Sequence, residues 1–218
     1  MKKYELTEIK NEAGLYRIRR ISDGCLGGWV GSEKNLSQEG DCWVFNNARA
    51  FGNAQVSGNA LVTGEAMLSG SAHVTGDAML SGNAGMSDDA MLSGTAHVTG
   101  KAHIFGNAHV TGKAHVTGSA QVSGTAHVFG TAHVTGKAHI FGNAHVTGGS
   151  WKASPLYVQG TRHSATNSSP GFLSIGCKTL SFANWSVQFQ EIGESEKYSP
   201  AEIVEYKSII DFFSAVGV

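Results

Sequence analysis

Histidine is the side chain whose type and spacing in this sequence could do chemistry. Nine of the ten histidines lie between residues 73 and 145, and their separations along the chain are multiples of six. A neutral imidazole offers one hydrogen-bond donor and one acceptor, titrates near neutral pH and binds soft metal ions. The pattern leaves three interpretations: packing of a duplicated aromatic side chain, a ligand-binding surface, or capture of a metal between neighbouring imidazoles.

The elements that must position these histidines are set by a six-residue repeat, Gly-x-Ala-x-Val-Ser/Thr, which runs from about residue 41 to residue 149. The Ala and Val slots are two residues apart and face the same side of an extended segment, while the residue between them faces outward. Gly with a polar neighbour makes a corner, because Gly adopts positive φ without a steric penalty. Each hexad is thus a very short strand that must stack on others, and a Gly in every hexad argues against a helix.

The tandem hexads resemble the hexapeptide-repeat superfamily, whose fold is a left-handed parallel β-helix with three hexads in each triangular coil. The resemblance implies an all-β repeat of about six coils, in which outward residues eighteen apart form ladders. Two histidine ladders supply the candidate binding residues: His97, His115 and His133, and His109, His127 and His145. No Cys or carboxylate lies on a matching rung to complete a tetrahedral site, so we expect neither a metal nor a cofactor.

One hexad departs from the pattern. Gly85 occupies an outward slot and Asp88 occupies the Gly slot. Asp tolerates the left-handed backbone of a corner, which favours a decayed repeat. A small notch with two carboxylates, Asp88 and Asp89, is the alternative.

Apolar side chains occupy outward slots in the first coils. The strip consists of Trp43, Phe45, Leu61 and Met79. Exposed apolar side chains in one zone mark a partner surface, and many members of the superfamily are homotrimers packed side by side. We therefore expect this strip to be a self-association face and the protein to be a homotrimer.

The repeat needs covers at its two open ends. Residues 1–40 are expected to form an N-terminal β cap, with a strand at 15–20 and a turn at 24–30 leading into the 41–149 repeat. Residues 150–218 are expected to form a C-terminal α+β module with two helices. In that module we expect the following elements: strands at 156–158 and 172–175, a polar loop at Ser164–Ser169, a helix through Phe182 and Ile192, and a last helix opened by the Ser199–Glu202 capping box.

Two residues before that polar loop are a further candidate site. Arg162 and His163 are adjacent in the chain. They are interpreted either as ordinary surface side chains or as contacts to a ligand.

The two ends carry a closer resemblance than the repeat does. The motifs are Leu-Tyr-Arg-Ile-Arg (15–19), Leu-Gly-Gly-Trp-Val (26–30), Glu-Lys-Asn-Leu-Ser-Gln-Glu-Gly (33–40), Pro-Leu-Tyr-Val-Gln-Gly-Thr-Arg-His (155–163) and Ile-Gly-Cys (175–177). They are similar to phage- and prophage-encoded hexapeptide-repeat proteins. The resemblance spans the chain and implies a viral or prophage origin, but no particular chemistry.

Composition and charge exclude several classes of protein. The net charge is −1, and Lys101, Lys113 and Lys137 form no dense stripe, so nucleic-acid binding is not expected. Apolar runs are too short for a membrane span. Three cysteines without a secretion signal favour reduced thiols and a cytoplasmic protein.

These observations favour a non-catalytic binding or assembly protein that binds or sequesters a host protein or a small-molecule ligand, with a possible counter-defence role. The alternative is a coenzyme A-dependent acyltransferase, because many hexapeptide-repeat proteins transfer acyl groups with a His base. Those enzymes interrupt the repeat with a loop, whereas this repeat is continuous. No unique His paired with a carboxylate stands out as a general base, so we expect no catalytic residue and lean away from an enzyme.

Overall fold

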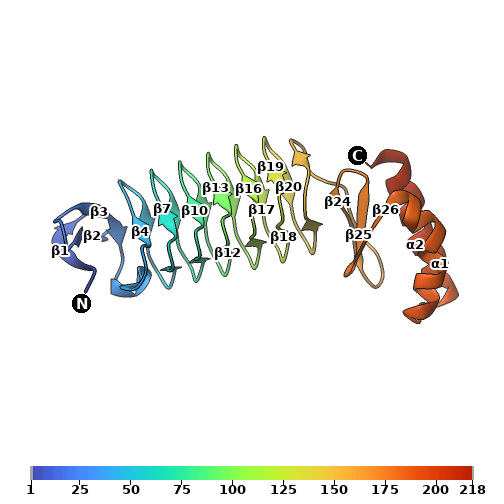
Figure 1. Cartoon of the computed structure of the whole chain (residues 1–218), viewed down its shortest axis with the longest axis horizontal. Coiled ribbons are helices and arrows are strands. Elements are labelled where there is room, and N and C mark those ends of the chain that lie inside the picture. Colours follow the sequence, from blue (N-terminus) through green and yellow to red (C-terminus); the bar gives the residue numbers. More distant parts are fainter. Residues whose placement is uncertain (1, 218) are drawn as a thin grey trace.

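The computed structural model describes residues 2–217 and shows an elongated rod (Figure 1). Three strands lie at its N-terminal end, a parallel β-solenoid forms its length, and a small sheet with two helices closes its C-terminal end. The solenoid has three faces, here named A, B and C, each a parallel sheet built from one short strand per coil.

From β4 onward, the strands of each face are every third strand of the chain, and β3 precedes β5 on face A. Face A contains β3 (Leu26–Val30), β5 (Arg49–Ala50), β8 (Met67–Leu68), β11 (Gly85–Met86), β14 (His103–Ile104), β17 (Gln121–Val122) and β20 (His139–Ile140). Face B contains β6 (Gln55–Val56), β9 (His73–Val74), β12 (Met91–Leu92), β15 (His109–Val110), β18 (His127–Val128) and β21 (His145–Val146). Face C contains β4 (Trp43–Val44), β7 (Leu61–Val62), β10 (Met79–Leu80), β13 (His97–Val98), β16 (His115–Val116), β19 (His133–Val134) and β22 (Ser150–Trp151).

The register between coils is eighteen residues. His97 pairs with His115, and His115 pairs with His133. The alanines from Ala48 to Ala144 and the aliphatic residues that follow them fill the interior, and all are buried. The parallel β-helix, its three-hexad coil and the inward direction of Ala and Val are thus confirmed.

The corners explain the regular Gly slot. Gly58 has φ +66°, and a Cβ there would lie 2.9 Å from the backbone nitrogen of Gly76 in the next coil. A side chain would therefore be strained by its own backbone and blocked by its neighbour. Asp88 adopts φ +59° in a Gly slot, as Asn46 does with φ +53° in the first hexad, which agrees with the decayed-repeat interpretation.

The solenoid has about seven turns rather than six, because both ends add to the repeat. β3 pairs in parallel with β5, and Leu36 forms a bridge with Val56. At the other end β22 continues face C beyond residue 149.

The N-terminal cap is an antiparallel meander that continues face A. β1 (Tyr4–Lys10) pairs with β2 (Tyr16–Arg20), which pairs with β3. β2 confirms the strand expected at 15–20. The turn expected at 24–30 was wrong, because residues 26–30 are β3. The glycines of β3 allow neighbouring atoms to pack closely against its backbone, since a Cβ on Gly27 or Gly28 would lie within 2.7 Å of those atoms.

A short 3-10 helix, η1 (Glu33–Asn35), closes the first coil. The buried Asn35 amide donates to the carbonyl oxygens of Gly52 and Ala54. The hydroxyl of buried Tyr4 donates to the carbonyl oxygen of Leu36 at 2.6 Å. These bonds satisfy backbone groups that the open end would otherwise leave without partners.

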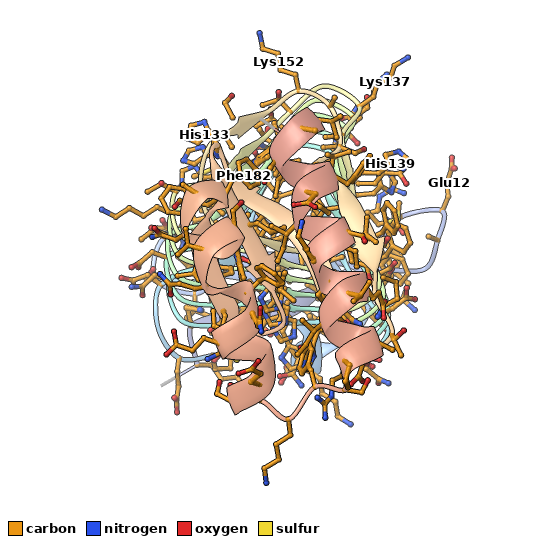
Figure 2. The ribbon with its side chains drawn as sticks, turned by 90° about the vertical axis from the view of Figure 1, so that its right-hand side faces the viewer. Glu12, His133, Lys137, His139, Lys152 and Phe182 are labelled. Atoms are coloured by element: carbon orange, nitrogen blue, oxygen red, sulfur yellow. The ribbon has the colours of Figure 1, made fainter. Side chains whose placement is uncertain are left out.

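The C-terminal module combines an antiparallel sheet with two helices. The sheet contains β23 (Tyr157–Gln159), β24 (Ser164–Ser169), β25 (Phe172–Ile175) and β26 (Lys178–Ser181) in that order. α1 (Phe182–Ser195) and α2 (Pro200–Val216) lie side by side across the end of the rod (Figure 2). Both expected helices are confirmed, and Ser199 and Glu202 form the expected capping box.

The polar loop expected at Ser164–Ser169 was wrong, because these residues form β24, an inner strand of the sheet. β24 pairs with β23 and β25, and the backbone nitrogen of Thr147 in the last coil donates to the carbonyl oxygen of Ser168. The strand thus joins the module to the solenoid. The sequence did not predict this strand, because its residues are small and mostly polar and do not alternate between apolar and polar side chains.

Candidate ligand-binding sites

The histidine ladders exist, but they lie on two different faces. On face C the ring centroids of His97 and His115 are 5.0 Å apart, and those of His115 and His133 are 4.8 Å apart. On face B the corresponding distances are 4.8 Å from His109 to His127 and 5.2 Å from His127 to His145. The six candidates therefore form two separate stacks and not one site. Within residues 2–217 no three His, Cys, Asp or Glu side chains are grouped as metal ligands.

The central ring of each ladder is the most perturbed. Burial, followed by repulsion from the two neighbouring imidazoles, lowers the pKa of His115 and of His127. His115 and His127 therefore favour the neutral imidazole, which is a donor and an acceptor but carries no charge.

Stability should depend on pH through these two residues. In the unfolded chain an imidazole has its ordinary pKa of 6.5, so below that pH the unfolded state takes up protons that the native state resists. The stability that His115 and His127 contribute as neutral imidazoles is fully present above about pH 6.5 and is lost as the pH falls below that value. We expect a lower melting temperature at about pH 5 than at about pH 8, and a smaller drop in the His115→Gln/His127→Gln variant.

His73→Gln is the matched control for that measurement, because His73 pairs with Gln55 and Met91 and has no histidine on an adjacent rung. The same melting temperature at both pH values in the unmodified protein would contradict this account of the ladders.

The apolar strip is partly covered by the protein itself. Trp43 is only 4% exposed. The ring of Tyr4 meets it edge-on at 6.1 Å, and the guanidinium of Arg20 lies 5.0 Å from its centroid. The other three members of the strip, Phe45, Leu61 and Met79, are partly exposed and remain open to a partner. Trp43 therefore serves the N-terminal cap, and self-association through the strip stays a prediction.

The lapsed hexad leaves a shallow hollow on face A. Its lining includes Glu65, Met67, Gly85 and His103, but not the two aspartates. One carboxylate oxygen of Asp88 instead accepts from the backbone nitrogen of Gly106 at 2.9 Å. The alternative of a notch with two carboxylates was therefore wrong.

A narrow pocket lies in the C-terminal module between the sheet and the two helices. Its volume, counted out to the open mouth, is about 510 Å³. Its apolar lining consists of Ile175, Trp185, Phe189, Ile192, Ile203 and Ile210. Its polar lining consists of His163, Cys177, Lys178, Glu196, Tyr198 and Tyr206.

One hydroxyl group fixes the segment that carries Arg162 and His163. The Tyr206 hydroxyl oxygen accepts from the backbone nitrogens of both residues and donates to the carbonyl oxygen of His163 at 2.9 Å. The carboxylate of Glu205 accepts from the backbone nitrogen of Thr161 at 2.7 Å. The segment is therefore bound to α2 through main-chain hydrogen bonds.

The two candidates from the sequence have different roles. The guanidinium of Arg162 lies 4.7 Å from the ring centroid of Tyr198 and donates to the carbonyl oxygens of Glu196 and Lys197. Arg162 thus holds the turn between α1 and α2. His163 lines the pocket, so it is the member of the pair placed to meet a ligand.

The mouth of the pocket is polar, and the Tyr198 hydroxyl there is neutral. Lys178 and Glu196 form an ion pair at 3.1 Å. Burial, together with nearby Tyr206, raises the pKa of Tyr198 to about 12, so this hydroxyl stays protonated and can donate. Sequence reasoning missed Lys178, Trp185 and Tyr198, because no local spacing connects residues on β26, α1 and the turn after it.

Part of the chain is similar to a known β-solenoid family and to a bacterial protein. The family described as "YdcK Beta solenoid repeat" matches residues 54–70. The "Uncharacterized acetyltransferase YdcK" of Escherichia coli (strain K12) is 39% identical over 72 aligned residues, which cover 25% of this chain and 22% of that protein. Together with the eighteen-residue coil, these matches fit a hexapeptide-repeat β-helix superfamily. The similarity spans only about a fifth of the relative's length. No helix among residues 2–217 is long and apolar enough to cross a membrane.

Proposed function

We propose that this protein is a non-catalytic binding protein that holds a small ligand in the C-terminal pocket, with the solenoid as a rigid spacer. The proposal includes a homotrimer, a cytoplasmic location and a phage or prophage origin with a host-derived ligand. The trimer and the origin rest on the resemblances in the repeat and in the end motifs. Light scattering that returned a monomer at micromolar concentration would reject the trimer.

The observation that carries the proposal is the convergence of polar groups over an apolar floor. Pockets of this composition are typical of small-molecule sites. Lys178 and His163 supply positive or donor groups at the wall, and the floor contains the ring of buried Trp185. The aromatic rings of Trp185 and Phe189, together with four isoleucines, form a lining that suits an aromatic ring. The ligand class supported best is a small aromatic molecule with one carboxylate.

We expect phenylacetate and indole-3-acetate to raise the melting temperature saturably, and neutral phenylacetamide to have a weaker effect. Lys178→Met should weaken carboxylate binding about tenfold, because it removes the cation and leaves Glu196 unpaired. Isothermal titration calorimetry measures this change. Lys152→Met is the matched control, because this lysine does not line the pocket.

Equal weakening by both lysine variants, or no saturable response to any of the aromatic acids, would overturn the assignment. A coenzyme A-dependent acyltransferase is the second candidate, favoured by the similarity to the Escherichia coli protein that is described as an uncharacterized acetyltransferase. A saturable rise in melting temperature with coenzyme A, unaffected by Lys178→Met, would favour that candidate instead.

A further inference from the structure

Charge is strongly segregated along the rod. Between residues 90 and 190 the sequence contains no Asp or Glu. Six cationic residues fall in this interval: Lys101, Lys113, Lys137, Lys152, Arg162 and Lys178. The net charge of the chain is therefore near zero only because opposite charges cancel. The second half of the solenoid is positive, and the N-terminal region is rich in carboxylates.

An exact duplication places part of this charge on face A. Residues 101–112 and 137–148 have the same sequence, Lys-Ala-His-Ile-Phe-Gly-Asn-Ala-His-Val-Thr-Gly. Each copy presents an outward His and Phe on the face, because alternate residues of an extended segment point the same way, and an exposed Lys at the adjoining corner. The two sets are Lys101, His103 and Phe105, and Lys137, His139 and Phe141.

The register fixes how far apart the two sets lie. His103 pairs with Gln121, and Gln121 pairs with His139. The sets are therefore two rungs apart, which corresponds to roughly 10 Å. The rung between them carries Ser119, Gln121 and Ser123, which are uncharged.

These side chains are available to a partner. Both lysines and both histidines of the two sets are exposed, and Phe141 is 47% exposed. The ring of Tyr157 lies 5.3 Å from that of Phe141 and extends the aromatic strip. Within residues 2–217 neither Lys101 nor Lys137 forms an ion pair with a carboxylate.

A third lysine adds to the same edge. Figure 2 shows Lys137 and Lys152 projecting from one edge of the prism, with His133 and His139 on the two sides of that edge. Face A therefore has a cationic border along one edge, imidazoles at its centre and aromatic rings beyond them.

This arrangement complements an acidic sugar chain. Ammonium groups bind carboxylates through charge-assisted hydrogen bonds, and the imidazoles with the Gln and Ser side chains can bind hydroxyl groups. The apolar C–H face of a sugar ring packs on the negative face of a phenyl ring. One sugar extends such a chain by about as much as one rung, so sets on every second rung match a polymer with an acid on every second sugar.

We propose that face A between residues 101 and 159 is a docking surface for a linear acidic polysaccharide with a carboxylate on alternate sugars. The surface is separate from the C-terminal pocket and does not depend on it. A nucleic acid carries a phosphate on every unit and favours a continuous row of cations, whereas the cationic sets here alternate with an uncharged rung.

Hyaluronate octasaccharide is the probe, because glucuronate alternates in it with a neutral sugar. Calorimetry at low salt should show binding that weakens as salt is added. Lys101→Gln/Lys137→Gln should reduce the affinity at least about tenfold, and Phe141→Ser should reduce it as well. The matched control is Lys113→Gln, which lies on a corner between faces B and C, and circular dichroism checks that each variant is folded.

The proposal is supported if hyaluronate binds, a neutral chitin oligosaccharide does not, and the control keeps the affinity of the unmodified protein. It is overturned by the absence of hyaluronate binding at low salt. It is also overturned if oligo(dT) of equal charge binds more tightly than hyaluronate, or if Lys113→Gln lowers the affinity as much as the double variant does.

Discussion

Ala108→Leu is expected to destabilise the protein by about 3 kcal/mol and to lower its melting temperature by roughly 6 to 12 °C. Ala108 is fully buried in the solenoid. Its carbonyl oxygen accepts from the backbone nitrogen of Met91 at 2.9 Å, and the backbone of the next coil lies equally close on the other side. The interior cannot widen at one coil without breaking these hydrogen bonds, so the larger side chain is not accommodated. Differential scanning calorimetry measures the change.

His109→Leu is the matched control, because it introduces the same side chain at the adjacent outward position. Its melting temperature above pH 7 should stay close to that of the unmodified protein. If the two variants lost the same stability, the inward and outward directions of the hexad would be assigned wrongly, and the ladders with them.

Tyr206→Phe is expected to destabilise the C-terminal module by about 3 kcal/mol. The variant keeps the buried ring and removes only the hydroxyl, which leaves the backbone nitrogens of Arg162 and His163 without their acceptor. Amide hydrogen exchange at these two residues should accelerate, and phenylacetate should bind less tightly because His163 is no longer held at the pocket wall. Urea unfolding, followed by the fluorescence of the tryptophans, measures the loss of stability.

Tyr157→Phe provides the comparison for that experiment. The Tyr157 hydroxyl also accepts from a backbone nitrogen, that of Asn143, but this contact is exposed and water can replace it. Equal losses in the two variants would show that the hydroxyl of Tyr206 does not hold the segment in the way described.

The solenoid could be predicted from the sequence because its repeat leaves few alternatives. Ala108 and Val110 are two residues apart, and a Gly corner follows every such pair, so one period determines the strand, the corner, the inward face and the register together. An error of one residue would place every Ala and Val in water. The ladders of outward histidines need one further fact, the three hexads in each coil, which the resemblance to the hexapeptide-repeat superfamily implies and the structure confirms.

The ends were harder to predict because their cues are local and ambiguous. Gly27 and Gly28 resemble a turn, yet they lie in a strand whose neighbours come too close for a Cβ. Ser164–Ser169 is polar throughout, so its composition favoured a loop over an inner strand. Trp43 does occupy an outward slot, and only the fold of the preceding residues shows that Tyr4 and Arg20 cover it.

The pocket could be predicted only in part. The sequence indicated His163, beside Arg162, as a candidate contact to a ligand. The hydroxyl that positions it belongs to Tyr206, more than forty residues further along the chain. Trp185 reads from the sequence as one member of an apolar helix face. Such a site depends on how two helices pack on a sheet, and no periodicity in the chain encodes that packing.

The first strand of the meander determines how long the particle can become. β1 is the outermost strand of its sheet, so one side of its backbone has no neighbouring strand among residues 2–217. Its pairing with β2 is irregular between Leu6 and Lys10, and charged side chains such as Glu5 and Glu8 lie along it. Irregular, charged edges resist the addition of a further strand from another molecule. With the helices α1 and α2 over the opposite end, these rods are expected to resist joining end to end into fibres.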